Sequence, residues 1–348
     1  MNNIDEDSES ISFVIQQSQN EPQNGISNLN GRSVKKLPLT NRGAIGRFLL
    51  APIVFPGSTL SGRRIKKKSL EKHSTSLDIL RRDLEETFNG ERVTLNTSDG
   101  IELDGMYFPP REKFLNGNPT AILCQGNFVC YEESQDLIKL YQELNISVMV
   151  FNYRGYGESQ HASTGSSAEG AVCDAEAAIA YVRERTEGIT NNNILVHGMS
   201  IGGGVAVCLT AQQQNKGVHL IVDQTFAKFE DVGADLTRRK KKDCEGLVSK
   251  VARVVMRELY GFDSEETIKE VTGEVCVIRS LNDNMMREGK YNHAKRLYDA
   301  RYPEGAKDEE GNDCSDLHRI EKSGGHLRMN YSGILDDLLQ FLYVSILK

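Results

Sequence analysis

Short apolar runs separated by predicted helices make up the chain from residue 92 onward. Alternating positions at 93–95 and 101–103 flank a Ser98-Asp99-Gly100 turn, which predicts an antiparallel hairpin. Runs typical of buried strands then follow at 120–124, 146–152, 194–196, 218–222, 275–279 and near 317–321. We predict helices at about 132–144, 168–185, 203–214 and 288–301, and a terminal helix from Ser332.

This alternation of strands and helices predicts a fold class. Successive strands joined by helices form right-handed crossovers, which give a mostly parallel sheet covered by helices on both faces. The segment from 229 to about 270 interrupts the alternation and predicts a cap inserted into an α/β domain that covers 91–348. Ser166 and Glu169 have the spacing of a capping box at the start of the helix at 168–185.

The first 90 residues have a different character. Residues 1–44 are rich in Asn, Gln, Ser, Asp and Glu, which predicts a disordered polar tail because such a segment buries little apolar surface. Residues 45–90 form an apolar and basic strap followed by a helix at 77–88. The apolar stretch at 48–56 contains two prolines, and it either packs on the domain or contacts a membrane interface together with the basic residues at 63–68.

Composition excludes several classes of protein. The 348 residues include 42 basic and 49 acidic side chains, so the net charge of −7 argues against a nucleic-acid partner. Seven cysteines without CxxC spacing indicate a reducing compartment and no structural zinc. The acidic start and the absence of a run of about 18 apolar residues predict a cytoplasmic protein without a signal peptide or membrane span.

A candidate nucleophile lies at the centre of the pattern. The apolar run at 194–196 leads into Gly198-Met199-Ser200-Ile201-Gly202, the Gly-x-Ser-x-Gly spacing of a strand-to-helix turn that exposes a serine hydroxyl. Glycines fit at both flanks because a side chain there would collide with the adjoining strand or helix. The pattern predicts a nucleophile elbow with Ser200 as the nucleophile.

A serine hydroxyl needs an imidazole to take its proton and a carboxylate to orient that imidazole. If the order is serine, acid, histidine, His326 is the candidate base, in the glycine-rich loop after the last short strand. Asp283, which follows the strand at 275–279, is the favoured acid. Asp223, at the end of the preceding strand, remains the alternative.

The oxyanion of an acyl-transfer intermediate needs two backbone N–H donors. Ile201, directly after the nucleophile, supplies one, and the loop after the strand at 120–124 supplies the other, from Asn127 or alternatively from Phe128. The turn at 151–159 ends the next strand with two glycines, and we interpret Arg154 in it as a structural buttress.

These motifs together resemble the α/β-hydrolase superfamily. The resemblance rests on Gln125-Gly126-Asn127, the Asn152–Ser159 turn, the Ser200 elbow, Asp223-Gln224-Thr225-Phe226, Asp283 and Gly325-His326. Within the superfamily the chain is similar to the serine hydrolases of the Bem46-like group and to the uncharacterised hydrolase family of chlamydiae and other intracellular bacteria. The resemblance covers about residues 92–348, and Gln125 replaces a histidine that is frequent in the family.

The resemblance implies an eight-stranded, mostly parallel sheet with a helical cap before the penultimate strand. It also implies hydrolysis of a carboxylic ester or thioester through an acyl-enzyme, without a metal or organic cofactor, on a small-molecule, lipid or acyl-protein substrate. The alternatives are a non-catalytic binding or scaffold protein, or a peptidase or acyltransferase of the same fold. Secretion by an intracellular bacterium without a signal peptide is also left open.

Five consecutive cations lie in the predicted cap: Arg238, Arg239, Lys240, Lys241 and Lys242. Such a run is either a solvated loop or a contact for an anionic membrane surface. In the second case it would hold the protein peripherally at a membrane, close to lipid or acyl-protein substrates.

Overall fold

The computed structural model describes residues 67–114, 117–127, 129–162, 167–240, 250, 256–257, 261–286, 291–307, 311–326 and 331–347. For 67–75 and 235–240 only the backbone is described. The predictions that lie outside these residues concern the tail at 1–44, the apolar stretch at 48–56, the basic residues at 63–66, Phe128, Ser166, Lys241 and Lys242.

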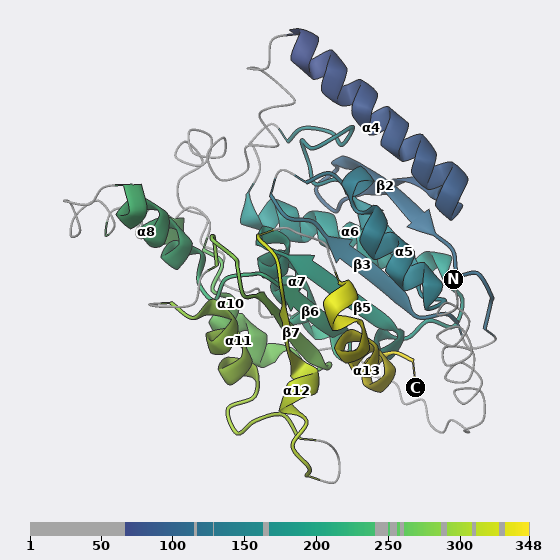
Figure 1. The fold of residues 1–348 in the computed structure, drawn as a ribbon. Helices are drawn as coiled ribbons and strands as arrows, with labels where there is room; N and C mark the ends of the chain where they lie inside the picture. The colour runs from purple at the N-terminus through teal and green to yellow at the C-terminus, as the bar shows by residue number, and fades with distance from the viewer. Residues whose placement is uncertain are drawn as a thin grey trace, which may run out of the picture.

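An eight-stranded sheet forms the centre of the molecule (Figure 1). Across the sheet the order is β1-β2-β4-β3-β5-β6-β7-β8; β1–β2 and β2–β4 pair antiparallel, and the other neighbours pair parallel. The expected mostly parallel sheet of eight strands is therefore confirmed. The strands are β1 (Glu91–Asn96), β2 (Glu102–Phe108), β3 (Thr120–Cys124), β4 (Ser147–Phe151), β5 (Ile194–Met199), β6 (His219–Asp223), β7 (Val275–Ser280) and β8 (Arg319–Lys322).

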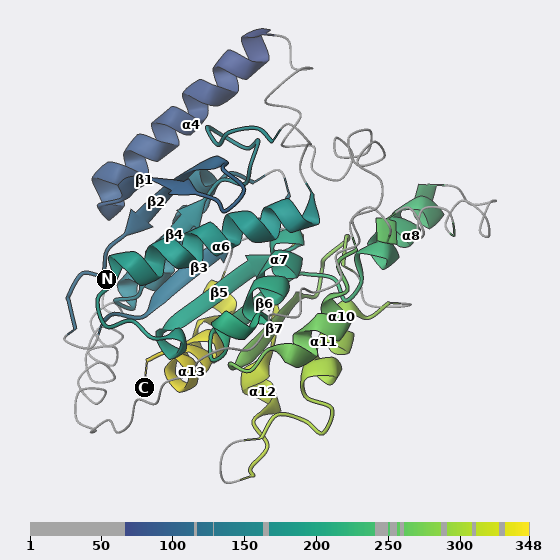
Figure 2. The same ribbon diagram turned by 180° about the vertical axis from the view of Figure 1, so that it is seen from behind.

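Helices cover both faces of the sheet. On one face lie α5 (Gln135–Glu143) and α13 (Leu335–Ser345), shown in front in Figure 1. The opposite face carries α6 (Ala168–Arg185), α7 (Ile201–Thr210) and α11 (His293–Arg301), as Figure 2 shows. In β3, Ile122 packs into the core on the α6–α7 side, whereas Ala121 and Leu123 pack into the core with α5 and α13. Burial on both faces explains why the central strands are continuous apolar runs.

The N-terminal helix α4 (Lys67–Phe88) runs beside the edge of the domain near β2 (Figures 1 and 2). It includes the helix expected at 77–88 but begins earlier. Leu84 packs into the α5 side of the core. Arg81, only 4% exposed, donates to the hydroxyl of Tyr131 in the short helix η2 (Tyr131–Glu133) and pairs with Glu132. An arginine buried among acids therefore attaches α4 to the α/β domain.

The chain between β6 and β7 contains α8 (Phe229–Lys240), α10 (Ser264–Thr267) and η5 (Ile268–Glu270). This is the expected insertion before the penultimate strand. In both views α8 projects away from the sheet (Figures 1 and 2). The remaining short helices are η3 (Asn191–Asn193), η4 (Gln213–Asn215), α12 (Ser315–His318) and η6 (Ser332–Ile334).

Several predicted boundaries were wrong by a few residues. The helix predicted at about 288–301, α11, begins at His293, and two other errors have a clear local cause. The N-cap of α6 is Ser167, whose hydroxyl accepts from the Gly170 N–H at 3.0 Å, so the predicted capping box begins one residue too early. The last strand starts at Arg319 rather than near Leu317, because Asp313 accepts from both the N–H and the hydroxyl of Ser315 and a helical turn, α12, forms first.

Candidate active site

Ser200 lies between β5 and α7 in a backbone conformation that is rare for a residue with a side chain, with φ 53° and ψ −117°. A Cβ at Gly198 would overlap the Gly202 carbonyl and Ala206, and a Cβ at Gly202 would overlap the Cys124 and Gln125 carbonyls. The two glycines thus allow a sharp turn against the end of β3. This geometry is that of a nucleophile elbow.

The structure brings Ser200, His326 and Asp283 together. Nε2 of His326 lies 3.0 Å from Ser200 Oγ, and Nδ1 of His326 lies 2.8 Å from Asp283 Oδ2. Because a carboxylate accepts hydrogen bonds, Nδ1 carries the proton and Nε2 is left to accept the serine proton. The three residues come from the ends of β5, β7 and β8, which meet at one edge of the parallel sheet.

Asp283 is oriented by its own loop. Its Oδ1 accepts from the N–H groups of Met285 and Met286, at 2.7 and 2.8 Å, while Oδ2 faces His326. The residue is 4% exposed and Ser200 is 7% exposed, so the contacts lie largely out of solvent. In such surroundings a charge-assisted hydrogen bond is stronger than it is in water.

Asp223, the alternative acid, occupies a different environment. Its Oδ2 accepts from the ammonium group of Lys322 at 2.5 Å and from the hydroxyl of Tyr331 at 2.7 Å. Burial acts to raise the pKa of Asp223, but Lys322 and His197 outweigh it and hold that pKa below its ordinary value. The carboxylate that faces His326 is therefore Asp283.

Of the two candidate oxyanion donors, Ile201 lies at the elbow and Asn127 lies in a loop that starts beside it. Ile201 is the first residue of α7, where backbone N–H groups have no partner within the helix. The loop that contains Asn127 follows directly from Cys124 and Gln125, whose carbonyls pack against Gly202. The side chain of Asn127 accepts a hydrogen bond from the hydroxyl of Tyr156 at 2.7 Å. Tyr156 lies in the turn after β4, so this turn holds Asn127 in place.

The turn at 151–159 also contains Arg154, which has the structural role that the sequence predicted. Arg154 donates through Nε to Asp174 in α6 and through Nη1 and Nη2 to Asp99 between β1 and β2. The guanidinium of Arg154 lowers the pKa of Asp99 well below its ordinary value. Arg154 thus connects three segments of the domain.

Sequence reasoning missed Lys322 and Tyr156. In β8 the buried positions are Ile320 and Lys322, so the period of two along the strand places this lysine inward. Because a buried lysine needs an acidic partner, its inward position in the sequence could have predicted a buried ion pair at this strand end. For Tyr156 no comparable sequence signal exists, because its contact with Asn127 joins two loops.

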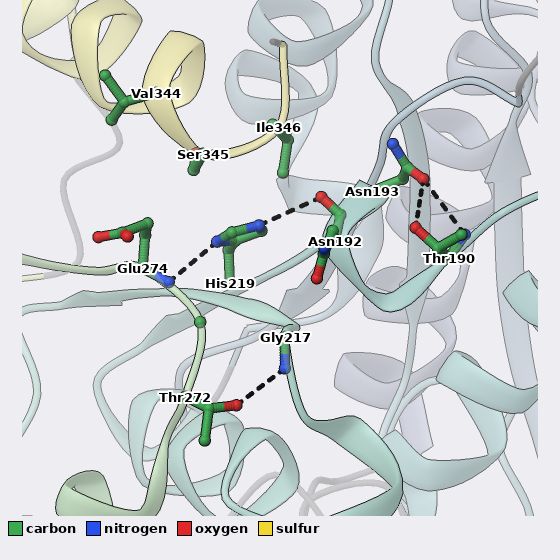
Figure 3. A pocket seen from close by; sticks show the side chains of 11 residues that line it. Thr190, Asn192, Asn193, Gly217, His219, Thr272, Glu274, Val344, Ser345 and Ile346 are labelled. Atoms are coloured by element: carbon green, nitrogen blue, oxygen red, sulfur yellow. Dashed lines mark hydrogen bonds between the residues drawn. The ribbon is translucent and has the colours of Figure 1, made fainter. Parts of the chain in front are cut away.

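A cavity lies at the edge of the sheet opposite to Ser200. This cavity of about 400 Å³ is lined by residues at the amino ends of β5, β6 and β7 and by the end of α13 (Figure 3). His219 in its wall accepts at Nδ1 from the Glu274 N–H and faces the Asn192 carbonyl through Nε2 (Figure 3). Both ring nitrogens therefore have backbone partners, and His219 is far in the fold from the edge that carries Ser200.

The basic run is described only in part. Arg238, Arg239 and Lys240 lie in the last turn of α8, where positive charge is favourable for a helix, and Lys241 and Lys242 follow outside the described residues. Within the described residues, no cluster of three or more His, Cys, Asp and Glu side chains could hold a metal ion. Among the same residues, none of the helices has the length and apolarity needed to cross a bilayer.

Comparisons with solved structures decide the fold. An α/β hydrolase from Vibrio vulnificus superposes with a TM-score of 0.60 at 20% identity, over 91% of this chain and 99% of that one. The chain has the α/β-hydrolase fold. A Pyrococcus furiosus esterase, Pf2001, shares this α/β-hydrolase fold with a TM-score of 0.55 at 15% identity, over 76% of this chain and 94% of the other.

Sequence comparisons agree with the α/β-hydrolase fold. The model of a family described as Chlamydia CHLPS protein (DUF818) matches residues 115–272. Protein bem46 of Schizosaccharomyces pombe is 33% identical over 144 residues, which are 41% of this chain and 46% of that protein. The α/β hydrolase domain-containing protein WAV2 of Arabidopsis thaliana is 28% identical over 60% of this chain and 65% of its own length.

A third relative is YfhR of Escherichia coli K12, an uncharacterised protein that is 29% identical over 42% of this chain and 50% of its own length. The resemblance to the Bem46-like proteins and to the chlamydial family is thus confirmed. The chain spans about half the length of bem46 and of YfhR.

Proposed function

We propose that this protein is a serine hydrolase that cleaves carboxylic esters or thioesters through an acyl-enzyme intermediate. The observation that carries the proposal is the continuous chain of contacts from Ser200 Oγ through the His326 ring to Asp283, at 3.0 and 2.8 Å. Nucleophile, base and orienting carboxylate are thereby in the order that serine catalysis requires.

In the first half of the reaction, Ser200 Oγ attacks the acyl carbonyl while His326 Nε2 takes the hydroxyl proton. Asp283 remains a carboxylate and stabilises the imidazolium that forms. The backbone N–H groups of Ile201 and Asn127 hold the negative oxygen of the tetrahedral intermediate. When that intermediate collapses, His326 returns the proton to the leaving alcohol or thiol, and the acyl group stays on Ser200.

In the second half, water takes the place of the leaving group. His326 accepts a proton from this water as its oxygen attacks the acyl carbon, and the tetrahedral intermediate then expels Ser200 Oγ. The proton passes from His326 back to Ser200, and the carboxylic acid leaves. Every step uses groups of this chain and one water molecule, so the chemistry requires no metal or organic cofactor.

The basic residues of the cap favour a lipid or acyl-protein substrate in this proposal. The segment between β6 and β7 leaves the sheet at the carboxyl end of β6, the edge that also carries Ser200, and α8 with Arg238, Arg239 and Lys240 belongs to that segment. Cations there, continued by Lys241 and Lys242, would attract an anionic membrane surface and bring acyl chains close to Ser200.

A fluorophosphonate probe tests the proposed chemistry, because only an activated serine reacts with it. We expect the parent protein to be labelled and Ser200→Ala, whose small side chain fits the elbow, to fold normally without being labelled. Acyl esters and thioesters of graded chain length then define the substrate class. An unlabelled parent protein would contradict the proposal and favour a binding or scaffold role, and turnover of amides alone would favour a peptidase.

A further inference from the structure

The loop that carries His326 begins and returns at one buried carboxylate. Lys322, the last residue of β8, and Tyr331, directly before η6, both donate to Oδ2 of Asp223, at 2.5 and 2.7 Å. All three side chains are buried, with 2%, 6% and 0% exposure for Lys322, Tyr331 and Asp223. The Lys322 ammonium also lies 4.3 Å from the centre of the Tyr331 ring.

The two residues after Asp223 continue the same connection. Gln224 donates through its side chain to the carbonyl of Gly325 at 3.0 Å, directly before His326. Its φ of 50° is in the left-handed region, which a residue other than glycine keeps only where its surroundings enforce it. Gln224 therefore contacts the histidine loop between the two ends that Asp223 holds.

The same segment also holds the nucleophile. The Asp223 carbonyl accepts from the Ser200 N–H at 2.9 Å, and the Thr225 hydroxyl donates to the Ser200 carbonyl at 2.5 Å. Residues 223–225 therefore touch the backbone of the serine and three points of the loop that carries the base. These contacts add a backbone connection to the side-chain contact between His326 and Ser200.

We propose that Asp223 is a positioning residue, which holds both ends of the His326 loop and thereby keeps Nε2 of the ring within reach of Ser200. The inference rests on the proposed hydrolase function. A buried ion pair adds little net stability compared with apolar packing, but it fixes geometry. Catalysis depends on such geometry, because a displacement of about 1 Å at the reacting atoms can cost about a hundredfold in rate.

The test compares buried Tyr331 with partly buried Tyr302, each of which donates a hydrogen bond within the protein. Tyr331→Phe removes one hydroxyl from Asp223 and leaves Lys322, the ring packing and all three proposed catalytic residues in place. Tyr302→Phe is the matched control, because the Tyr302 hydroxyl donates to the Val275 carbonyl, at the amino end of β7 and away from the site. Both variants are assayed with a short soluble ester at a temperature where circular dichroism shows them folded.

We expect kcat to fall between about tenfold and a hundredfold in Tyr331→Phe, with KM unchanged, because the ring of His326 is misplaced rather than the substrate. In Tyr302→Phe, kcat should match the parent even though its melting temperature also falls. Equal kcat in parent and Tyr331→Phe would overturn the positioning role.

A second measurement does not depend on turnover. Hydrogen exchange of the amides at 323–330 should become faster in Tyr331→Phe and stay at the parental rate in Tyr302→Phe. If the parent protein neither hydrolyses esters nor reacts with fluorophosphonate, the proposed function fails. The exchange experiment still tests whether Asp223 holds the loop that carries His326. Unchanged exchange at 323–330 in Tyr331→Phe would show that Asp223 does not hold this loop.

Discussion

At the scale of single residues, two carboxylates at neighbouring strand ends differ in what surrounds them. Asp283 accepts two backbone N–H groups and faces His326, whereas Asp223 is engaged by Lys322 and Tyr331. The sequence placed both at the correct edge of the sheet and favoured Asp283 by its loop. Only the contacts show which carboxylate reaches the imidazole, because that depends on how β8 and its loop return to the site.

Substitution of the two acids should therefore lower activity to different extents. Asp283→Asn should lower kcat by about 10⁴-fold, because an amide at this position favours the wrong tautomer of His326. Asp223→Asn should cost much less, since it disturbs only the position of the loop. Steady-state kinetics on a short soluble ester measure both variants, and a larger loss in Asp223→Asn would move the acid of the triad to Asp223.

His197, three residues before the nucleophile on β5, makes stability depend on pH. Burial lowers the pKa of this imidazole despite the attraction of nearby Asp223, and Nδ1 is hydrogen-bonded to the Tyr141 hydroxyl at 2.8 Å. Below about pH 6.5 the unfolded chain takes up a proton at this histidine that the folded chain refuses. The free energy of unfolding therefore loses a contribution as the pH falls.

The matching prediction concerns the slope of stability against pH. In His197→Asn the free energy of unfolding should depend less on pH between 7 and 5 than in the parent, by up to about 1.4 kcal/mol per pH unit. Urea titrations at several pH values measure the slope. Identical slopes in both proteins would show that His197 takes up its proton equally well in the folded state.

At the scale of elements, α4 is attached by charge as well as by apolar packing. Arg81 forms ion pairs with Asp104, Glu132 and Glu158, and the first two of these acids are buried. Burial raises the pKa of Glu132, although Asn152 and Arg81 oppose this effect. Glu132 lies in η2, directly after the loop that contains Asn127, so α4 supports the segment next to the oxyanion donors.

Removal of the Arg81 ion pairs should lower the stability of the protein. Arg81→Met leaves the buried Glu132 without its cation, whereas Asp104 keeps Arg92. The free energy of unfolding should fall by about 3–5 kcal/mol. Arg82→Met is the matched control, because Arg82 is exposed on the same helix and its loss should change stability by less than about 0.5 kcal/mol. Chemical denaturation compares them, and equal stability of the two variants would contradict the anchoring role.

At the scale of the whole molecule, the charge is unevenly placed. The net charge is −7, yet five consecutive cations occupy the last turn of α8 and the two positions after it, and α8 projects from the body of the protein (Figure 1). Near an anionic membrane each cation contributes about 1 kcal/mol, so five could contribute about 5 kcal/mol to binding. The competing explanation is favourable interaction of Arg238, Arg239 and Lys240 with the carboxyl end of the helix.

Liposome sedimentation separates the two explanations. Replacement of all five cations at 238–242 by glutamine should abolish binding to acidic liposomes at low salt and leave hydrolysis of a short soluble ester unchanged. A control with lysine at positions 238 and 239 keeps the charge and should still bind. Equal sedimentation of the glutamine variant and the parent would leave the run as a feature of the helix end alone.

The sequence by itself determined the class of fold and the members of the candidate site. Periodicity and turn residues are local properties, and they were sufficient to locate the eight strands, the cap and the elbow at Ser200. The same local signals failed by one or two residues at Ser167 and Arg319, where side-chain hydrogen bonds decide the boundary.

Only the tertiary structure decided how residues distant in the chain are paired. Ser200 and His326 are 126 positions apart, and Asp223 and Lys322 are 99 apart. Contacts of this kind depend on strand order across the sheet, which places β5 beside β6 and brings β8 back next to β7. A linear pattern does not encode that order. The contact of Asp283 with His326, the pairing of Lys322 with Asp223 and the link from Tyr156 to Asn127 therefore follow from the folded chain alone.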